Sequence, residues 1–391
     1  MRVVCACFFC LSLLALVTSS CGGGSSMSTP PPTASCKPAL QPKFAYVLNY
    51  TDATVSMYTV NSCTGALSPT TPATIPVGVD TGINAESMVV DPAGRFLYVA
   101  NLVSNATDQA TISMFTINLS TGVLTPTSPA MVSTGFFPQG ITVDPFGKFL
   151  YTANSDDNTI SMFTINQSSG VLTPTTPSSI LLPPLFSSRS SFSSPDFVSV
   201  DPSGLFLYAS DQGNGSISTF TINSGTGVLT PTAPAGVVAG PDPYGVAVDH
   251  TGKFAYVPDE VMNMVLMYTV DSSTGVLTSN PAYAVPAGNQ PAWMAVDPTS
   301  KFAYAVNRFD GTVSMYTIDP NTGTLTPNTP AIVKAGSWPL PMVVNASGTF
   351  AYVGNQNDDS VSIFRINSNG VLAAAGTTQT GADPVAIALT H

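Results

Sequence analysis

Short apolar segments alternate with polar, turn-forming segments along the chain after residue 43, and the same pattern recurs. The clearest marker is a Phe two residues before a Tyr, as in "KFAYVLN" (43–49). It occurs seven times, at Phe44, Phe96, Phe149, Phe206, Phe254, Phe302 and Phe350. Internal repetition on this scale indicates a fold assembled from similar units.

Each full repeat holds four short segments rich in Val, Ile, Thr, Phe and Tyr, bounded by Gly, Pro, Asn and Asp. In order, these segments, named a to d, follow the patterns Pxx[VIM]xVDPxG, KFxYVxN, T[VI]SM[YF]T[VI] and TGxLTP; examples are residues 138–147, 43–49, 54–60 and 121–126. This composition predicts four β-strands joined by tight turns. Segment b is almost continuously apolar, which is typical of a strand that is covered on both faces.

A repeated antiparallel sheet of four short strands predicts an all-β, seven-bladed β-propeller over residues 43–391. A parallel β-helix is the weaker alternative, because its rungs would be shorter and more regular. The first repeat lacks segment a, whereas "PVAIALTH" (384–391) is a segment a without a follower. We therefore expect residues 385–390 to join the N-terminal blade and close the ring, which would leave no open sheet edge.

The first 20 residues differ from the repeats. Arg2 precedes a long apolar stretch that ends in small residues, which is typical of a signal peptide over 1–20. Cleavage before Cys21 would allow a lipid anchor there, with 21–42 as a Gly/Ser/Pro-rich tether; ordinary cleavage and secretion is the alternative. Export would leave Cys36 and Cys63 as an even pair, which predicts a disulfide. We expect a monomer in the cell envelope, in the periplasm or at the cell surface.

Several segment b motifs, YVLN (46–49), YVAN (98–101), YTAN (151–154) and YVGN (352–355), resemble the YVTN-type propeller repeat. The order of the four segments is also similar to that of the seven-bladed lactonases, the phosphogluconolactonase-like propellers. The resemblance covers 43–391 and implies a propeller fold and lactone hydrolysis. Lactonase-like propellers often carry His, or an Arg–His pair, just after the Pro that opens segment a. The corresponding positions here are Ser87, Gln139, Asp196, Tyr244, Ala292, Leu340 and Val385.

Charge is scarce and mainly acidic. Only 8% of residues are charged and the net charge is −11, which argues against nucleic acid and against electrostatic docking on anionic lipid. Ten charges recur at fixed repeat positions and are therefore predicted to be scaffold: Lys43, Arg95, Lys148, Lys253, Lys301, Asp91, Asp144, Asp201, Asp249 and Asp297. His250 takes a turn position and His391 ends the chain, so neither is expected at a site.

Charges outside the repeated positions are the catalytic candidates: Glu86, Asp196, Asp259, Glu260, Arg308 and Asp310. In a propeller, the b–c and d–a loops and the starts of the innermost strands converge at one mouth of the central channel, where ligand sites are common. Opening a lactone needs an activated water and a group that holds the developing oxyanion. Carboxylates and Arg308 offer both, and the alternative for each is a solvated loop charge.

Aromatic residues indicate a place for a ligand. Tyr244, Trp293 and Trp338, together with Gln139, lie near the starts of segments a, where aromatic faces suit sugars and other flat ligands; packing between blades is the alternative. The long segment 174–194 is expected to be a lid or a surface insertion. We expect no cofactor and no metal, because the acidic loops 154–159 and 355–360 lack the spacing of a calcium loop.

These features favour a ligand-binding or protein-interaction scaffold in the cell envelope, with a small carbohydrate-like ligand or a protein partner. A lactonase that uses carboxylates and Arg308 in place of His is the second hypothesis, and an adhesive surface protein is the third. A polar cluster converging at the channel mouth would favour the enzyme. A mouth of small and apolar groups would favour the scaffold.

Overall fold

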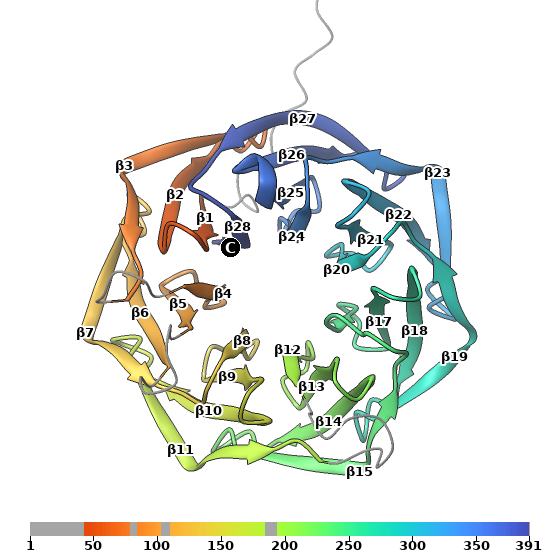
Figure 1. Cartoon of the computed structure of the whole chain (residues 1–391), viewed down its shortest axis with the longest axis horizontal. Helices are drawn as coiled ribbons and strands as arrows, with labels where there is room; N and C mark the ends of the chain where they lie inside the picture. Colours follow the sequence, from red (N-terminus) through yellow and green to blue (C-terminus); the bar gives the residue numbers. More distant parts are fainter. Residues whose placement is uncertain (1–42, 79–83, 103–109, 184–193, 391) are drawn as a thin grey trace, which may run out of the picture. The chain divides into compact units, whose positions relative to one another are not determined.

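The computed structural model describes residues 43–78, 84–102, 110–183 and 194–390, which form a ring of seven four-stranded sheets (Figure 1). All strand pairs within a sheet are antiparallel, and in each blade the strands follow one another from the channel outward. Blade 1 comprises β28 and β1–β3, and blades 2 to 7 each take the next four strands in sequence. The predicted seven-bladed propeller is confirmed.

The strands of one type have nearly the same length in every blade except blade 5. The innermost strands are β4 (Ala85–Val90), β8 (Pro138–Val143), β12 (Pro195–Val200), β16 (Ala247–Val248), β20 (Pro291–Val296), β24 (Pro339–Val344) and β28 (Pro384–Leu389). The second strands are β1 (Phe44–Asn49), β5 (Phe96–Asn101), β9 (Phe149–Asn154), β13 (Phe206–Asp211), β17 (Phe254–Asp259), β21 (Phe302–Asn307) and β25 (Phe350–Asn355).

The third strands are β2 (Thr54–Val60), β6 (Thr111–Ile117), β10 (Thr159–Ile165), β14 (Ser216–Ile222), β18 (Met264–Val270), β22 (Thr312–Ile318) and β26 (Ser360–Ile366). The outer strands are β3 (Leu67–Pro76), β7 (Leu124–Ser133), β11 (Leu172–Leu181), β15 (Leu229–Val238), β19 (Leu277–Pro286), β23 (Leu325–Lys334) and β27 (Leu372–Gln379). A short 3₁₀ segment, η2 (Gln356–Asp358), follows β25.

The outer strands are longer than the sequence pattern predicted. The motif TGxLTP covers only the beginning of most of these strands, and the Pro/Thr-rich stretch after it continues the pairing. In β11, Leu172–Pro174 pair with Ile165–Phe163, and after a bulge Ser179–Leu181 pair with Ser161–Thr159. Proline is tolerated there because an outer strand has one unpaired edge. The predicted lid segment 174–194 therefore starts as strand, and its part 184–193 lies outside the described residues.

The ring closes as predicted. Strand β28 pairs with β1 in register Ala45↔Leu389, Tyr46↔Ala388 and Val47↔Ile387. The backbone N–H of Thr390 donates to the carbonyl of Phe44 at 3.0 Å. Blade 1 thus combines strands from both ends of the described chain.

Aspartates stabilise the turns between the first and second strands, at the face of the ring opposite the channel mouth. Between β12 and β13, one carboxyl oxygen of Asp201 accepts the backbone N–H groups of Leu205 and Phe206 at 3.0 and 2.9 Å. The other oxygen accepts the N–H of Ser203 at 3.0 Å. Equivalent bonds recur at Asp91, Asp144, Asp249 and Asp297. These five residues are scaffold, as the repeat predicted.

A tyrosine on each second strand links its blade to the next. Seven hydroxyl groups donate to glycine carbonyls at 2.9–3.0 Å: Tyr46 to Gly122, Tyr98 to Gly170, Tyr151 to Gly227, Tyr208 to Gly275, Tyr256 to Gly323, Tyr304 to Gly370 and Tyr352 to Gly65. The anchor Phe packs on the same glycine, and a Cβ on Gly122 would overlap the ring of Phe44. All seven junctions, the closing one included, are therefore built alike.

Some sequence predictions concern residues that are not described. The signal segment 1–20, the tether 21–42, Cys21 and Cys36 all lie outside the described residues. Cys63 lies in the turn between β2 and β3. Because Cys36 is outside the described residues, the disulfide between the two stays a prediction. Within the described ranges, no helix is both long and apolar enough to cross a membrane.

Candidate active site

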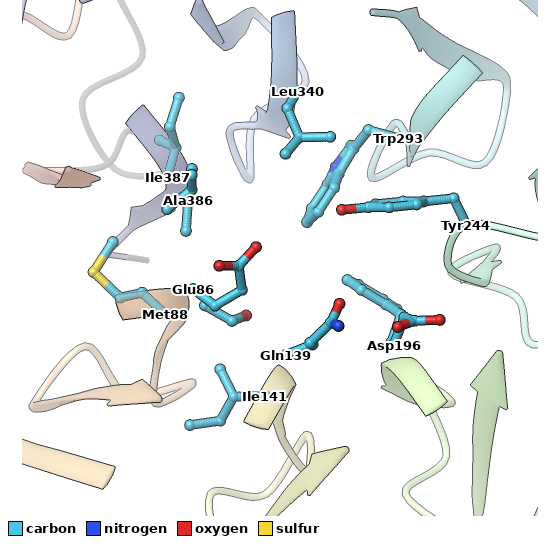
Figure 2. Close-up of a pocket in the computed structure, with 13 residues that line it drawn as sticks. Glu86, Met88, Gln139, Ile141, Asp196, Tyr244, Trp293, Leu340, Ala386 and Ile387 are labelled. Atoms are coloured by element: carbon cyan, nitrogen blue, oxygen red, sulfur yellow. The ribbon is translucent and has the colours of Figure 1, made fainter. Parts of the chain in front are cut away.

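The starts of the innermost strands surround a cavity of about 140 Å³ at the loop-bearing mouth of the channel (Figure 2). Its lining comes from six of the seven innermost strands and from the segment before β16. The residues are Glu86, Ser87, Met88, Gln139, Ile141, Asp196, Phe197, Tyr244, Trp293, Leu340, Val385, Ala386 and Ile387. Four predicted site residues besides Glu86 are among them: Gln139, Asp196, Tyr244 and Trp293.

A bulge at the start of the innermost strands projects one residue into the cavity. In β8, Pro138 pairs with Asn154 and Gly140 pairs with Ala153, so Gln139 is left out of the ladder. Asp196 is left out of β12 in the same way, between Pro195 and Phe197. An extra residue in a bulged strand re-aims a side chain, and here the side chain lines the channel.

The same bulge corrects one sequence alignment. In β4, Ala85 pairs with Asn101 and Ser87 pairs with Ala100, so the projecting residue is Glu86. We had assigned Ser87 to this position, one residue too late, because this repeat has Ala85 where the others have the opening Pro. Counting five residues back from the turn aspartate Asp91 gives the correct place, Glu86.

Asp196 is a buried carboxyl group with few partners. The hydroxyl of Ser194 donates to it at 3.2 Å, and the backbone N–H of Gln212 lies 3.4 Å from its other oxygen. Its exposed fraction is 7%. Burial raises the pKa of Asp196 to about 7, against the lowering effect of these two hydrogen bonds. At neutral pH the group therefore exchanges a proton readily.

Glu86 is the second carboxyl group of the cavity. Figure 2 shows its carboxyl end directed toward the middle of the channel. Burial raises the pKa of Glu86 to about 6; the charge of Asp383 adds to the increase and the charge of Arg308 opposes it. Glu86 is therefore mainly ionised at pH 7, whereas Asp196 is about half protonated.

Arg308 and Glu260 lie beside Tyr244 at the rim. Arg308 Nη1 is 3.3 Å from Glu260 Oε1, and both side chains are largely buried. The guanidinium carbon lies 5.3 Å from the ring centre of Tyr244. Burial raises the pKa of Tyr244 to about 12, and Arg308 counteracts part of this increase. The Tyr244 hydroxyl points into the channel in Figure 2 and is a protonated donor at neutral pH.

The two tryptophans have different places. Trp293 lines the cavity; its ring meets Phe197 edge to face at 5.3 Å, and its indole N–H donates to the carbonyl of Met342 at 2.8 Å. Phe197 and Trp293 also border a second cavity of about 200 Å³ beside β16. Trp338 precedes β24 and is 37% exposed. Its ring packs edge to face against that of Phe309, with the ring centres 6.2 Å apart. Trp338 does not line the first cavity.

Two predicted candidates are structural. Asp259 is fully buried and accepts the backbone N–H groups of Asp242, Val261 and Met262 at 2.7–3.1 Å. It stands where most other blades have Asn at the end of the second strand. Asp310 accepts the backbone N–H of Asn289 at 2.7 Å. Both groups stabilise loop backbone, so neither is available for chemistry.

The acidic loops serve the same structural purpose. Asp157 accepts the backbone N–H of Phe136 at 2.7 Å, and Asp358 accepts that of Ser337 at 2.6 Å. The part of the chain that the structure describes contains no cluster of three or more metal-ligating His, Cys, Asp or Glu residues. The polar groups at the mouth offer acid–base and hydrogen-bonding chemistry.

Comparisons with known proteins point to one family. A family model described as "Lactonase, 7-bladed beta-propeller" matches residues 37–184 and 183–389. A putative 6-phosphogluconolactonase from Bacteroides fragilis is 23% identical with a TM-score of 0.73, covering 93% of this chain and 100% of that one. The periplasmic gluconolactonase of Pseudomonas aeruginosa is 18% identical with a TM-score of 0.70, covering 89% and 99%. No curated protein matches the chain.

These matches overturn the scaffold prediction. The family match and the solved lactonase-type neighbours favour the second hypothesis, a lactonase, over a binding or interaction scaffold. None of them supports a lipid anchor at Cys21. The polar groups that converge at the mouth are also the feature that we expected to distinguish the enzyme from the scaffold.

Proposed function

Because this chain belongs to the family of seven-bladed β-propeller lactonases, we propose that it hydrolyses a lactone at the mouth of its central channel. One observation carries the proposal: Glu86 and Asp196 line the same cavity, and burial raises the pKa of each carboxyl group, to about 6 and about 7. Paired acids with separated pKa values near neutrality suit proton transfer in both directions.

Hydrolysis of a lactone needs two proton transfers. Water attacks the carbonyl carbon and loses a proton to a base, while the carbonyl oxygen becomes an oxyanion. The bond from this carbon to the ring oxygen then breaks, and the ring oxygen takes a proton from an acid. The product is an open-chain hydroxy acid, which releases its own proton at neutral pH.

The two carboxyl groups have different parts in this proposal. Glu86, mainly ionised at pH 7, takes the proton of the attacking water. Asp196 in its protonated form gives a proton to the departing ring oxygen. The Tyr244 hydroxyl donates a hydrogen bond to the oxyanion, and Arg308 beside its ring counteracts part of the rise in the pKa of Tyr244, which makes the hydroxyl a stronger donor.

The pH dependence follows from these roles. Activity should fall below about pH 6, where Glu86 becomes protonated, and should fall again above about pH 7, where Asp196 loses its proton. A narrow bell-shaped profile of kcat/KM, measured in a pH-stat from pH 4 to 9, is the expected result. A rate that rises steadily with pH would contradict this pair.

A panel of lactones tests the function. The purified protein, Glu86→Gln and Asp196→Asn should be assayed together with Asp156→Asn, which removes an exposed carboxylate from a loop on the same face. We expect hydrolysis by the parent protein and by Asp156→Asn, and a loss of roughly 100-fold in the other two. Rates at the uncatalysed background for every lactone in the panel would contradict a lactonase.

Export is a separate proposal that rests on the sequence alone. The apolar segment 1–20 supports removal of a signal peptide, and the even pair Cys36 and Cys63 supports a disulfide in the exported chain. The mass of the mature protein from its native host gives the cleavage site. Alkylation of both cysteines without a reductant would exclude the disulfide.

A further inference from the structure

We propose that the substrate of this site is a neutral lactone that bears an apolar substituent and no phosphate group. This inference rests on the proposed lactonase function and adds the substrate class. Two independent features carry it: the distribution of charge around the mouth, and the division of the cavity into a polar and an apolar side.

The basic residues of the described ranges lie mainly away from the cavity. Lys43, Arg95, Lys148, Lys253 and Lys301 immediately precede the second strands, at the turn face of the ring, and Arg365 lies there over the ring of Phe350. Lys334 is exposed at the end of the outer strand β23. This leaves Arg308 near the cavity, and its charge is already paired with Glu260 at 3.3 Å. The remaining basic residues, Arg2, Lys37 and Arg189, lie outside the described residues.

The charge that faces a ligand is instead negative. Glu86 and Asp196 line the cavity. The negative charge of Asp383 helps raise the pKa of Glu86, and the charges of Asp211 and Asp242 help raise that of Asp196, so further carboxylates lie close to both groups. A phosphate ester carries close to two negative charges at pH 7. Proteins bind such groups with unpaired Arg or Lys side chains or with helix N-termini. Among the described residues the one helical segment is η2, which is three residues long. A phosphorylated lactone would therefore be repelled.

The cavity has two chemically different sides. Glu86, Gln139, Asp196 and Tyr244 come from blades 2 to 5 and present carboxyl, amide and hydroxyl groups. Blades 6, 7 and 1 contribute only apolar groups to the lining: Trp293, Leu340, Val385, Ala386 and Ile387. Figure 2 shows Leu340, Ala386 and Ile387 across the channel from Asp196, and blades 2 to 4 add Met88, Ile141 and Phe197 beside the polar groups. A ligand with its ester group toward the carboxyl groups must place another part of itself against hydrocarbon.

The apolar side continues outward as an aromatic pair. Trp338 lies two residues before Leu340, and Phe309 directly follows Arg308. Their rings are in edge contact at 6.2 Å, with exposed fractions of 37% and 62%. A substituent that leaves the lactone ring past Leu340 would cover these rings. Burying an alkyl chain there would strengthen binding, by roughly fourfold for each methylene removed from water.

Three probes distinguish the substrate classes: glucono-δ-lactone, its 6-phosphate, and δ-decalactone, which is uncharged and carries a five-carbon chain. We expect kcat/KM at pH 7 to be highest for δ-decalactone and at least about tenfold lower for the phosphate than for glucono-δ-lactone. Hydrolysis of the phosphate faster than both neutral lactones would overturn the inference and leave the lactonase function in place. Hydrolysis of none of the three would overturn both.

Two matched variants test the aromatic pair. Trp338→Ala should lower kcat/KM for δ-decalactone about fivefold more than for glucono-δ-lactone, mainly through KM. Phe146→Ala removes an exposed aromatic ring, 62% exposed, from the turn face and should leave the ratio of the two substrates unchanged. An equal loss for both substrates in Trp338→Ala would show that the ring does not contact the substituent, and would overturn that part of the inference.

Discussion

Asp196, near the start of strand β12, and Asp201, directly after its end, have different roles. Asp201, at the turn face, accepts three backbone N–H groups and fixes the reversal of the chain into β13. Asp196, five residues earlier at the channel mouth, has one hydroxyl and one distant N–H as partners, and burial raises its pKa to about 7. The same residue type is structural at one face and reactive at the other.

The difference extends around the ring. At the turn face, Asp recurs at the equivalent position in blades 2 to 6, because each of these turns has backbone N–H groups that need the same acceptor. At the mouth, the equivalent projecting positions carry Glu86, Gln139, Asp196, Tyr244, Ala292, Leu340 and Val385, with no residue type used twice. Repetition therefore identifies the frame, and departure from repetition identifies the site.

Removing the closing strand should have the largest effect on the frame. A chain that lacks residues 384–391 loses β28 and exposes the edge of β1, and we expect a loss of about 5 kcal/mol or more in unfolding free energy. Urea denaturation followed by tryptophan fluorescence measures it. Deletion of His391 alone is the control. A truncated chain as stable as this control would contradict closure by β28.

Replacing the turn aspartate should weaken the frame without touching the chemistry. Asp201→Ala leaves several backbone N–H groups without their acceptor, so we expect a loss of about 3 kcal/mol in unfolding free energy. The kcat of the molecules that stay folded, measured well below the new Tm, should be unchanged. A large loss of kcat with normal stability would reverse the roles assigned to the two ends of β12.

The mouth aspartate should respond in the opposite sense. The raised pKa of Asp196 means that its ionisation opposes folding as the pH rises from about 4 through about 7. Asp196→Asn should therefore be more stable than the parent protein by about 2 kcal/mol at pH 8, with little difference at pH 4, while kcat falls. Thermal unfolding at the two pH values gives the comparison. A variant that is less stable than the parent protein at both pH values would show that Asp196 has a structural role.

The junctions between blades should give the smallest and most uniform effect. Tyr352→Phe at the closing junction and Tyr151→Phe at an internal one each remove one buried hydroxyl that donates to a glycine carbonyl. We expect each to cost about 1 kcal/mol, and the two costs to agree within error. A much larger loss of unfolding free energy in Tyr352→Phe would show that the closing junction contributes more to stability than the internal junctions.

The repeats made the fold predictable because seven copies average out local ambiguity. The same comparison recognised Glu86, Asp196 and Arg308 as charges that the frame does not need. It failed where one copy departs from the rest: blade 2 lacks the opening Pro, which shifted the alignment from Glu86 to Ser87. It also retained Asp259 as a candidate, although this residue replaces the Asn that ends most second strands and has the same structural role.

The remaining site features depend on contacts that no repeat encodes. The ion pair between Arg308 and Glu260 joins two neighbouring blades, and Trp293 meets Phe197 across the short strand β16. The raised pKa values come from burial in the assembled channel, which a pattern along the chain does not report. The outer strands exceeded the prediction because an edge strand accommodates proline that would interrupt an inner one.

The pairing of β1 with β28 also sets a schedule for synthesis. Phe44 and its partner Thr390 are separated by 346 residues. At the usual speed of a ribosome, roughly 20 to 70 s pass between the emergence of the two. During this time β1 has an unsatisfied edge that any other extended segment could occupy. Synthesis of blade 1 thus begins before that of the other six blades, but blade 1 is complete only when β28 has emerged. Until then the exposed edge of β1 needs protection from incorrect pairing.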